Sequence, residues 1–120
     1  MNTLEQVTEI VVTYSKHGWQ LKRLLLAPDV RALVTESERE IFEDAVVEDA
    51  SINALWFARP SHAGREAWEL RLVAETPYAL FETFEADEEE EDREEVRREM
   101  EARLREYAGR APNHSPLRPS

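Results

Sequence analysis

The sharpest boundary in the sequence is a run of carboxylates, Glu85-Ala-Asp-Glu-Glu-Glu-Glu-Asp92, where one kind of pattern gives way to another. Before the run, the sequence contains β-type segments, and in the clearest of them Trp68, Leu70 and Leu72 recur at every second position. After it, Glu and Arg alternate as far as Glu106 around a narrow apolar stripe at helical spacing. The two periods belong to different kinds of element. We therefore expect a sheet followed by a C-terminal helix.

The C-terminal helix is predicted from Asp87 to Ala108, with Gly109 at its end because glycine accepts the left-handed conformation there. Its apolar stripe consists of Val96, Met100, Leu104 and Tyr107. Glu stands four residues before Arg in the pairs Glu89–Arg93, Glu94–Arg98, Glu99–Arg103 and Glu101–Arg105. Each such pair contributes about 0.2–0.5 kcal/mol to a helix, and the acidic first turn complements the helix dipole. We therefore interpret this helix as a solvated outer layer of the domain.

The N-terminal segment predicts an amphipathic helix over residues 3–17. Its apolar side chains fall on one stripe, formed by Leu4, Val7, Ile10, Val11 and Tyr14. Thr3 and Gln6 have the spacing of a capping box, and Gly18 suits the end of the helix. A strand is predicted next, from Trp19 to Ala27, because leucines occupy both of its faces before Pro28 stops it.

Residues 29–50 permit two interpretations. Asp29 could begin one short helix, and Ser37 with Glu40 could cap another. Alternatively, a strand begins at Val46. We favour one or two short helices that cross over the sheet, because a structureless connection of this length is uncommon in a compact domain.

Three β-type runs follow, over residues 52–58, 66–74 and 78–85. The middle run is the clearest, because Trp68, Leu70 and Leu72 alternate with Glu69 and Arg71. The first and third runs carry apolar groups on both sides. Short connections between the runs predict an antiparallel three-stranded meander.

Together these elements predict an α+β fold in the order α-β-(short α)-β-β-β-α. An antiparallel β-sheet of about four strands would be packed on one face by the N-terminal and C-terminal helices. Residues 1–108 would form a single α+β domain, and the Pro-rich residues 109–120 a disordered C-terminal tail. The strands carry more apolar surface than two helices on one side can cover. We therefore expect a homodimer, unless residues 29–50 cover the second face.

Charge and composition narrow the classes of function. The chain has a formal net charge of −11 and a pI near 4.7, which disfavours nucleic acid and anionic membrane surfaces as partners. It has no cysteine for a disulfide or thiolate metal site. Phosphate-binding and dinucleotide-binding loops need several closely spaced glycines, and the chain has only three glycines in all, so no cofactor is expected. No secretion-signal pattern or membrane-spanning stretch stands out, and a cytoplasmic location is expected.

One loop concentrates chemically useful side chains. The segment Arg59-Pro-Ser-His-Ala-Gly-Arg65 brings Arg59, His62 and Arg65 into one short connection. The two arginines could hold a common anion, which makes the loop a hypothetical ligand-binding or enzymatic site. Adjacent Ser61 and His62 do not make a nucleophile and base, because triads assemble from separate parts of a fold. No catalytic residue is therefore assigned.

The carboxylate run permits three interpretations. A calcium loop would interleave its acids with a glycine turn, which this run lacks, so no metal site is assigned. In the second interpretation the run is a solvated surface that keeps the protein soluble. In the third, a basic partner is bound by Glu88, Glu89, Glu90, Glu91 and Asp92.

In small size, strong acidity and α+β composition the chain resembles bacterial secretion chaperones and immunity proteins. The favoured hypothesis is a non-enzymatic protein-binding module, chaperone-like or immunity- or inhibitor-like, for a basic or partly unfolded partner. The alternative is a small anionic-ligand binding or enzymatic site at the Arg59–Arg65 loop. Trp19, Trp56 and Trp68 lie in strand-like runs and are expected in the core or in an interface.

Overall fold

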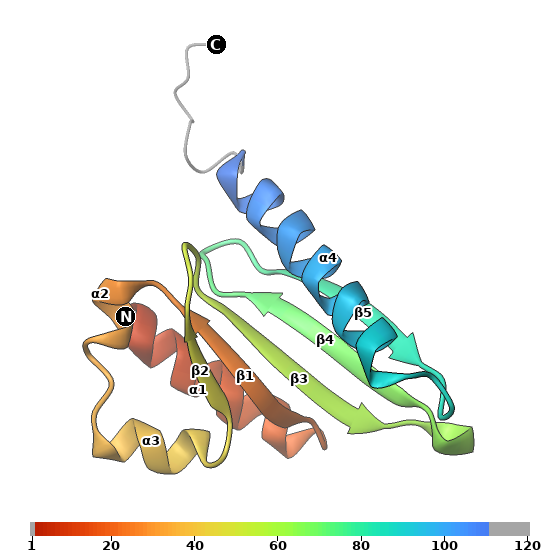
Figure 1. Cartoon of the computed structure of the whole chain (residues 1–120). Helices are drawn as coiled ribbons and strands as arrows, with labels where there is room; N and C mark the ends of the chain where they lie inside the picture. Colours follow the sequence, from red (N-terminus) through yellow and green to blue (C-terminus); the bar gives the residue numbers. More distant parts are fainter. Residues whose placement is uncertain (1, 111–120) are drawn as a thin grey trace.

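The computed structural model describes residues 2–110 as one sheet with helices on both of its sides (Figure 1). Its elements in chain order are α1 (Thr3–Lys16), β1 (Gln20–Leu26), α2 (Pro28–Arg31), α3 (Glu36–Phe42), β2 (Val46–Asp49), β3 (Ala54–Pro60), the 3-10 turn η1 (His62–Gly64), β4 (Glu66–Leu72), β5 (Tyr78–Phe84) and α4 (Glu90–Gly109). The strands form a single sheet in the order β2-β1-β3-β4-β5. The predicted α+β class is confirmed.

The sheet has five strands and mixed pairing, so the prediction of about four antiparallel strands is wrong in these details. The extra strand is β2, which lies at one edge and runs parallel to β1, with Val47 opposite Leu24. The other neighbouring strands are antiparallel. Parallel pairing needs a crossover connection, which α2 and α3 supply between β1 and β2. β2 is hard to see in the sequence because it has four residues and mostly exposed side chains.

Helices α1 and α4 lie on opposite faces of the sheet, so the prediction that both pack on one face is wrong. On one face, Val7 of α1 shares a core with Phe57 of β3. On the other, Leu104 of α4 shares a core with Trp56 of β3. Successive side chains of a strand point to opposite faces, and the first five residues of β3 are all buried. Both faces of this central strand therefore need cover, and each helix supplies one layer.

The connector between β1 and β2 packs on the α1 side. Val30 of α2 and Phe42 of α3 are both buried in that core. The opposite face is covered by α4, which lies along β4 and β5 (Figure 1). A homodimer is expected from the sequence only if the chain leaves one sheet face open. α4 covers the sheet face opposite α1, so the argument from an uncovered apolar face no longer supports a homodimer. The homodimer stays a prediction.

Capping boxes set the starts of α1 and α3. At α1, the Glu5 amide donates to Asn2 Oδ1 at 2.8 Å, and the Asn2 amide donates to Glu5 Oε1 at 3.0 Å. These residues replace the predicted pair Thr3 and Gln6, one position away. The box at α3 lies two residues before its predicted position. The spacing of a capping box is therefore a good guide to the presence of a helix and a weaker guide to its first residue.

The boundaries of α4 also differ slightly from the prediction. The helix begins at Glu90 and continues through Gly109, with Arg110 as its C-terminal cap. The predicted start of the tail at residue 109 thus falls inside the helix, and residues 111–120 lie outside the described residues. No helix within residues 2–110 is both long and apolar enough to cross a bilayer.

Candidate functional site

Two arginines of α4 turn inward and cover aromatic rings of the sheet. Arg97 is only 2% exposed, and its guanidinium carbon lies 3.9 Å from the centroid of Trp68 and 5.2 Å from that of Phe84. Arg93 lies 5.9 Å from the Phe84 centroid. The aliphatic stems of arginine pack like apolar side chains, and the flat guanidinium stacks on a ring face. The narrow apolar stripe of α4 is thus widened by two charged residues.

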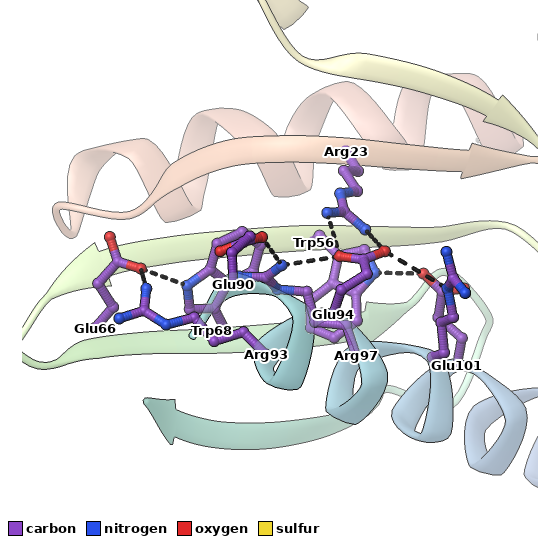
Figure 2. A network of polar contacts seen from close by, with 10 residues as sticks. Arg23, Trp56, Glu66, Trp68, Glu90, Arg93, Glu94, Arg97 and Glu101 are labelled. Carbon is purple, nitrogen blue, oxygen red and sulfur yellow. Dashed lines mark hydrogen bonds and ion pairs between the residues drawn. The ribbon is translucent and has the colours of Figure 1, made fainter. Parts of the chain in front are cut away.

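The charge of Arg97 is balanced by carboxylates of its own helix. Arg97 Nη1 donates to Glu90 Oε2 at 2.8 Å and to Glu94 Oε1 at 2.9 Å (Figure 2). Glu94 also accepts two hydrogen bonds, at 2.8 and 3.1 Å, from Arg23 of β1. These bonds, from Arg23 first and then from Arg97, lower the pKa of Glu94 to about 2 against the opposing effect of burial. Glu94 is therefore an ionised link between α4 and β1.

The buried indoles of the same face are tied to carboxylates. Trp56 Nε1 donates to Glu101 at 2.8 Å, and Trp68 Nε1 donates to Glu66 at 3.1 Å (Figure 2). Arg93 Nη1 reaches the same Glu66 carboxylate at 3.3 Å. The expectation that Trp56 and Trp68 lie in the core is confirmed, with both side chains buried. Their N–H groups need partners in the core, and the acids of β4 and α4 supply them.

The inward turn of Arg93 and Arg97 leaves carboxylates on the outside of the first turns of α4. We call the exposed residues Glu91, Asp92, Glu95 and Glu99 the outer acidic face. Glu95 follows Glu91 by four residues and Asp92 by three, and Glu99 follows Glu95 by four, so the acids lie on one side of the helix. None of the four forms an ion pair with another residue of the described chain. Their mutual repulsion is therefore left without a close cation.

The predicted helical ion pairs are only partly present, and the five acids predicted to bind a partner differ in their contacts. Of the four predicted Glu-to-Arg pairs, Glu94–Arg98 alone lies within ion-pair distance in residues 2–110, at 3.8 Å. Among the five acids predicted to bind a partner, Glu88 accepts the Glu85 amide at 2.9 Å, and Glu90 pairs with Arg97. The other three, Glu89, Glu91 and Asp92, are exposed. In the described part of the chain, no three His, Asp or Glu side chains are grouped so as to hold a metal ion.

The Arg59–Arg65 loop is divided between two directions. Arg59 and His62 line a hollow of about 400 Å³ on the α1 side of the sheet, together with Trp19 and Phe81. Arg65 turns away and pairs with Glu85, with its Nε 2.9 Å from the carboxylate. The structure therefore brings two of the three predicted ligand-binding residues together and separates the third.

Trp19 and Phe81 are not among the predicted site residues, and neither is close to the loop in sequence. Phe81 lies opposite Glu69 in the β4–β5 pairing, and Glu69 lies opposite Phe57 in the β3–β4 pairing. The strand register places Phe81 on the face that α1 partly covers. A correct register is the one signal that could have found it.

Comparison with known proteins assigns no function. No protein-family model, no curated protein and no solved structure matches the chain. Functional proposals therefore depend on the geometry and charge of the described residues.

Proposed function

We propose that the protein is a non-enzymatic protein-binding module, and that the outer acidic face of α4 holds a basic partner. The observation that carries the proposal is the separation of charge around α4. Arg93 and Arg97 cover the sheet, while Glu91, Asp92 and Glu95 face solvent without an ion-pair partner in the described chain. A cationic surface would relieve their repulsion.

The surroundings of this face support a protein as its partner. The net charge of −11 opposes the approach of a nucleic acid. The acids fan over a helix surface and do not converge, which suits several cations spread over a basic surface. α3 is also acidic, but it carries the exposed Arg39 among its acids. The first two turns of α4 have their cations turned inward.

The fold also gives more support to one of the two kinds of partner expected from the sequence than to the other. A partly unfolded partner would bind to apolar strand surface that the helices leave uncovered. α1 and α4 cover most of that surface. The surface feature that remains available for binding is the outer acidic face. It supports a folded basic protein as the partner, as in an immunity- or inhibitor-like role.

The test is retention of a partner from an extract of the source organism. The bait proteins are the wild type, a face variant (Glu91→Gln, Asp92→Asn, Glu95→Gln, Glu99→Gln) and a control variant (Glu9→Gln, Glu40→Gln, Asp44→Asn, Glu48→Gln). Removing four negative charges from −11 leaves both variants at −7. All eight substituted residues are exposed, so both variants should fold.

We expect the wild type and the control variant to retain the same protein at low salt, and the face variant to lose it. The retained protein should elute at about 1 M salt, where the Debye length falls to about 3 Å. Equal retention by the face and control variants would show that only net charge matters. Retention that does not respond to salt would also contradict the proposal.

A further inference from the structure

We propose that the hollow on the α1 side of the sheet binds a small aromatic carboxylate. This hollow is separate from the outer acidic face. We call it the Trp19 hollow. Its main lining residues are Trp19, Arg59, His62, Ala67, Phe81 and Thr83. α4 packs on the other face of the sheet, and the hollow shares no residue with the outer acidic face. This site is therefore independent of the proposed partner surface.

The strand register explains why the sheet is hollowed at this point. Arg59, Ala67 and Thr83 lie opposite one another in a row across β3, β4 and β5. Ala67 has the smallest side chain in this row, so the surface of the sheet is depressed between Arg59 and Thr83. Phe81, in the next row, stands beside it with 58% of its surface exposed. A methyl group between larger side chains thus makes the floor of the hollow.

Two aromatic rings form a wall of the hollow. The Trp19 and Phe81 centroids are 6.4 Å apart, and the ring planes meet at 83°. Such edge-to-face pairs hold each other in a defined orientation. The exposed face of Phe81 is therefore an ordered apolar surface against which a flat ring can pack.

Arg59 supplies a cation that is fixed in place and has free donors. Its guanidinium carbon lies 5.0 Å from the Trp19 ring centroid, and its Nη1 donates to the His17 carbonyl at 3.1 Å. These two contacts hold the side chain, but a guanidinium has five N–H donors. No carboxylate of the described chain lies within ion-pair distance of Arg59. Within residues 2–110, Arg59 therefore has no acidic partner, although the protein has 26 acids and only 15 bases.

Glu69 lies on the same face of the sheet as Arg59, but its carboxylate already has a partner. Glu69 borders the neighbouring hollow on the other side of Trp19. Its carboxylate accepts a hydrogen bond from the hydroxyl of Tyr14, and Arg71 Nη1 donates a hydrogen bond to that hydroxyl at 3.3 Å. The hydroxyl of Tyr14, partly desolvated and held in this way, has a raised pKa and stays protonated. Glu69 is thus engaged by Tyr14, and Arg59 keeps its capacity for an outside anion.

The chemistry of the lining selects the class of ligand. A carboxylate would accept two hydrogen bonds from Arg59, and an attached aromatic ring would lie over Ala67 against Phe81. The volume of about 400 Å³ falls within the range of roughly 300–1,000 Å³ that is usual for small-molecule sites. A carboxylate without a ring would leave the aromatic wall unused, and a neutral ring would leave Arg59 unpaired.

The experiment uses the indole N–H signals of the ¹⁵N-labelled full chain, with 2-naphthoate as the probe and uncharged 2-naphthamide as its control. The chain has three tryptophans. The indole N–H groups of Trp56 and Trp68 are held by Glu101 and Glu66 on the α4 side, so they serve as internal references. A Trp19→Phe variant assigns the third signal. We expect 2-naphthoate to move the Trp19 signal saturably while the two reference signals stay in place.

Matched arginine variants complete the test. Arg59→Gln should weaken 2-naphthoate binding about tenfold to a hundredfold, which is the range for a lost charge-assisted hydrogen bond. Arg65→Gln, in the same loop but paired with Glu85, should leave binding unchanged. Unchanged Trp56 and Trp68 signals will show that each variant is folded. The proposal is overturned if the Trp19 signal does not move, if 2-naphthamide moves it equally, or if Arg59→Gln binds like the wild type.

Discussion

The guanidinium of Arg97 lies 3.9 Å from the ring centroid of Trp68, between α4 and the sheet. A charged residue thus occupies the centre of a helix-to-sheet interface, where it is 2% exposed. Its Nε is buried without a hydrogen-bond partner in residues 2–110, so the contact with the ring provides part of the compensation. This contact explains how a helix with few apolar residues can cover one face of the sheet, while Glu91, Asp92, Glu95 and Glu99 stay on its outside.

Replacing Arg97 should destabilise the protein more than replacing any exposed arginine of α4. Arg97→Ala removes the packing on Trp68 and the charge that balances Glu94, and we expect a loss of about 2–4 kcal/mol in the free energy of unfolding. Arg97→Met keeps an unbranched stem over the ring, so it should cost about half as much. Urea unfolding followed by tryptophan fluorescence measures both changes.

Arg98 provides the control for these substitutions. Its side chain is 76% exposed and lies 3.8 Å from Glu94, so Arg98→Ala should change the unfolding free energy by no more than about 0.5 kcal/mol. If Arg97→Ala were as stable as Arg98→Ala, the inward position of Arg97 would be wrong.

The stability contributed by Glu94 should depend on pH. Its folded-state pKa of about 2 is below the value of about 4.3 for glutamate in an unfolded chain. The ionised form is therefore favoured by folding, and its contribution is complete above about pH 5 and is lost as the pH falls toward 2. Because the side chain is 30% exposed, we expect about 1–2 kcal/mol at neutral pH after allowing for solvent screening.

The measurement compares wild type with Glu94→Gln by urea unfolding at a series of pH values. The wild type should be more stable near neutral pH, and the difference should shrink as the pH is lowered through about 4. Glu95→Gln, at the exposed next position, should show no comparable trend. A constant gap between wild type and Glu94→Gln down to about pH 2.5 would contradict the ionised link to Arg23.

The capping box at α1 gives a prediction that separates two neighbouring residues. Asn2 accepts the Glu5 amide at 2.8 Å, so Asn2→Ala should cost about 0.5–2 kcal/mol. Thr3, the residue that the sequence pattern favours as the cap, lies inside the helix. Thr3→Ala should therefore change stability by less than about 0.5 kcal/mol. Thermal unfolding of the two variants ranks them directly, and the opposite order would place the cap at Thr3.

Local patterns in the sequence predict most of the elements but not their layers. The alternation of Trp68, Leu70 and Leu72 locates β4 correctly, because a period of two is the repeat of side chains along a strand. The opposite placement of α1 and α4 does not follow from the sequence pattern, in which Arg93 and Arg97 look solvated. The stems of these arginines provide the apolar surface that α4 lacks by composition. Without them, the helix carries too little apolar surface to be assigned a sheet face of its own.

The Trp19 hollow is predicted only in part. Arg59 and His62 are neighbours in one loop, so the sequence can connect them. Phe81 reaches the same place through two strand pairings, and the register of those pairings is a property of the whole sheet. The prediction that Arg65 shares an anion with Arg59 stays a prediction, and the structure does not support it, because Arg65 pairs with Glu85, which follows β5, twenty residues later.

The central claim, that the outer acidic face of α4 selects a basic partner, is tested most directly by chemical-shift mapping with a short arginine-rich peptide. We expect the amide signals of Glu91, Asp92, Glu95 and Glu99 to move most at low salt, and the movement to fade at high salt. The control variant at −7 should behave like the wild type, and the face variant of equal charge should lose the response. Shifts that are as large on α3 as on α4, or that persist in the face variant, would contradict the account.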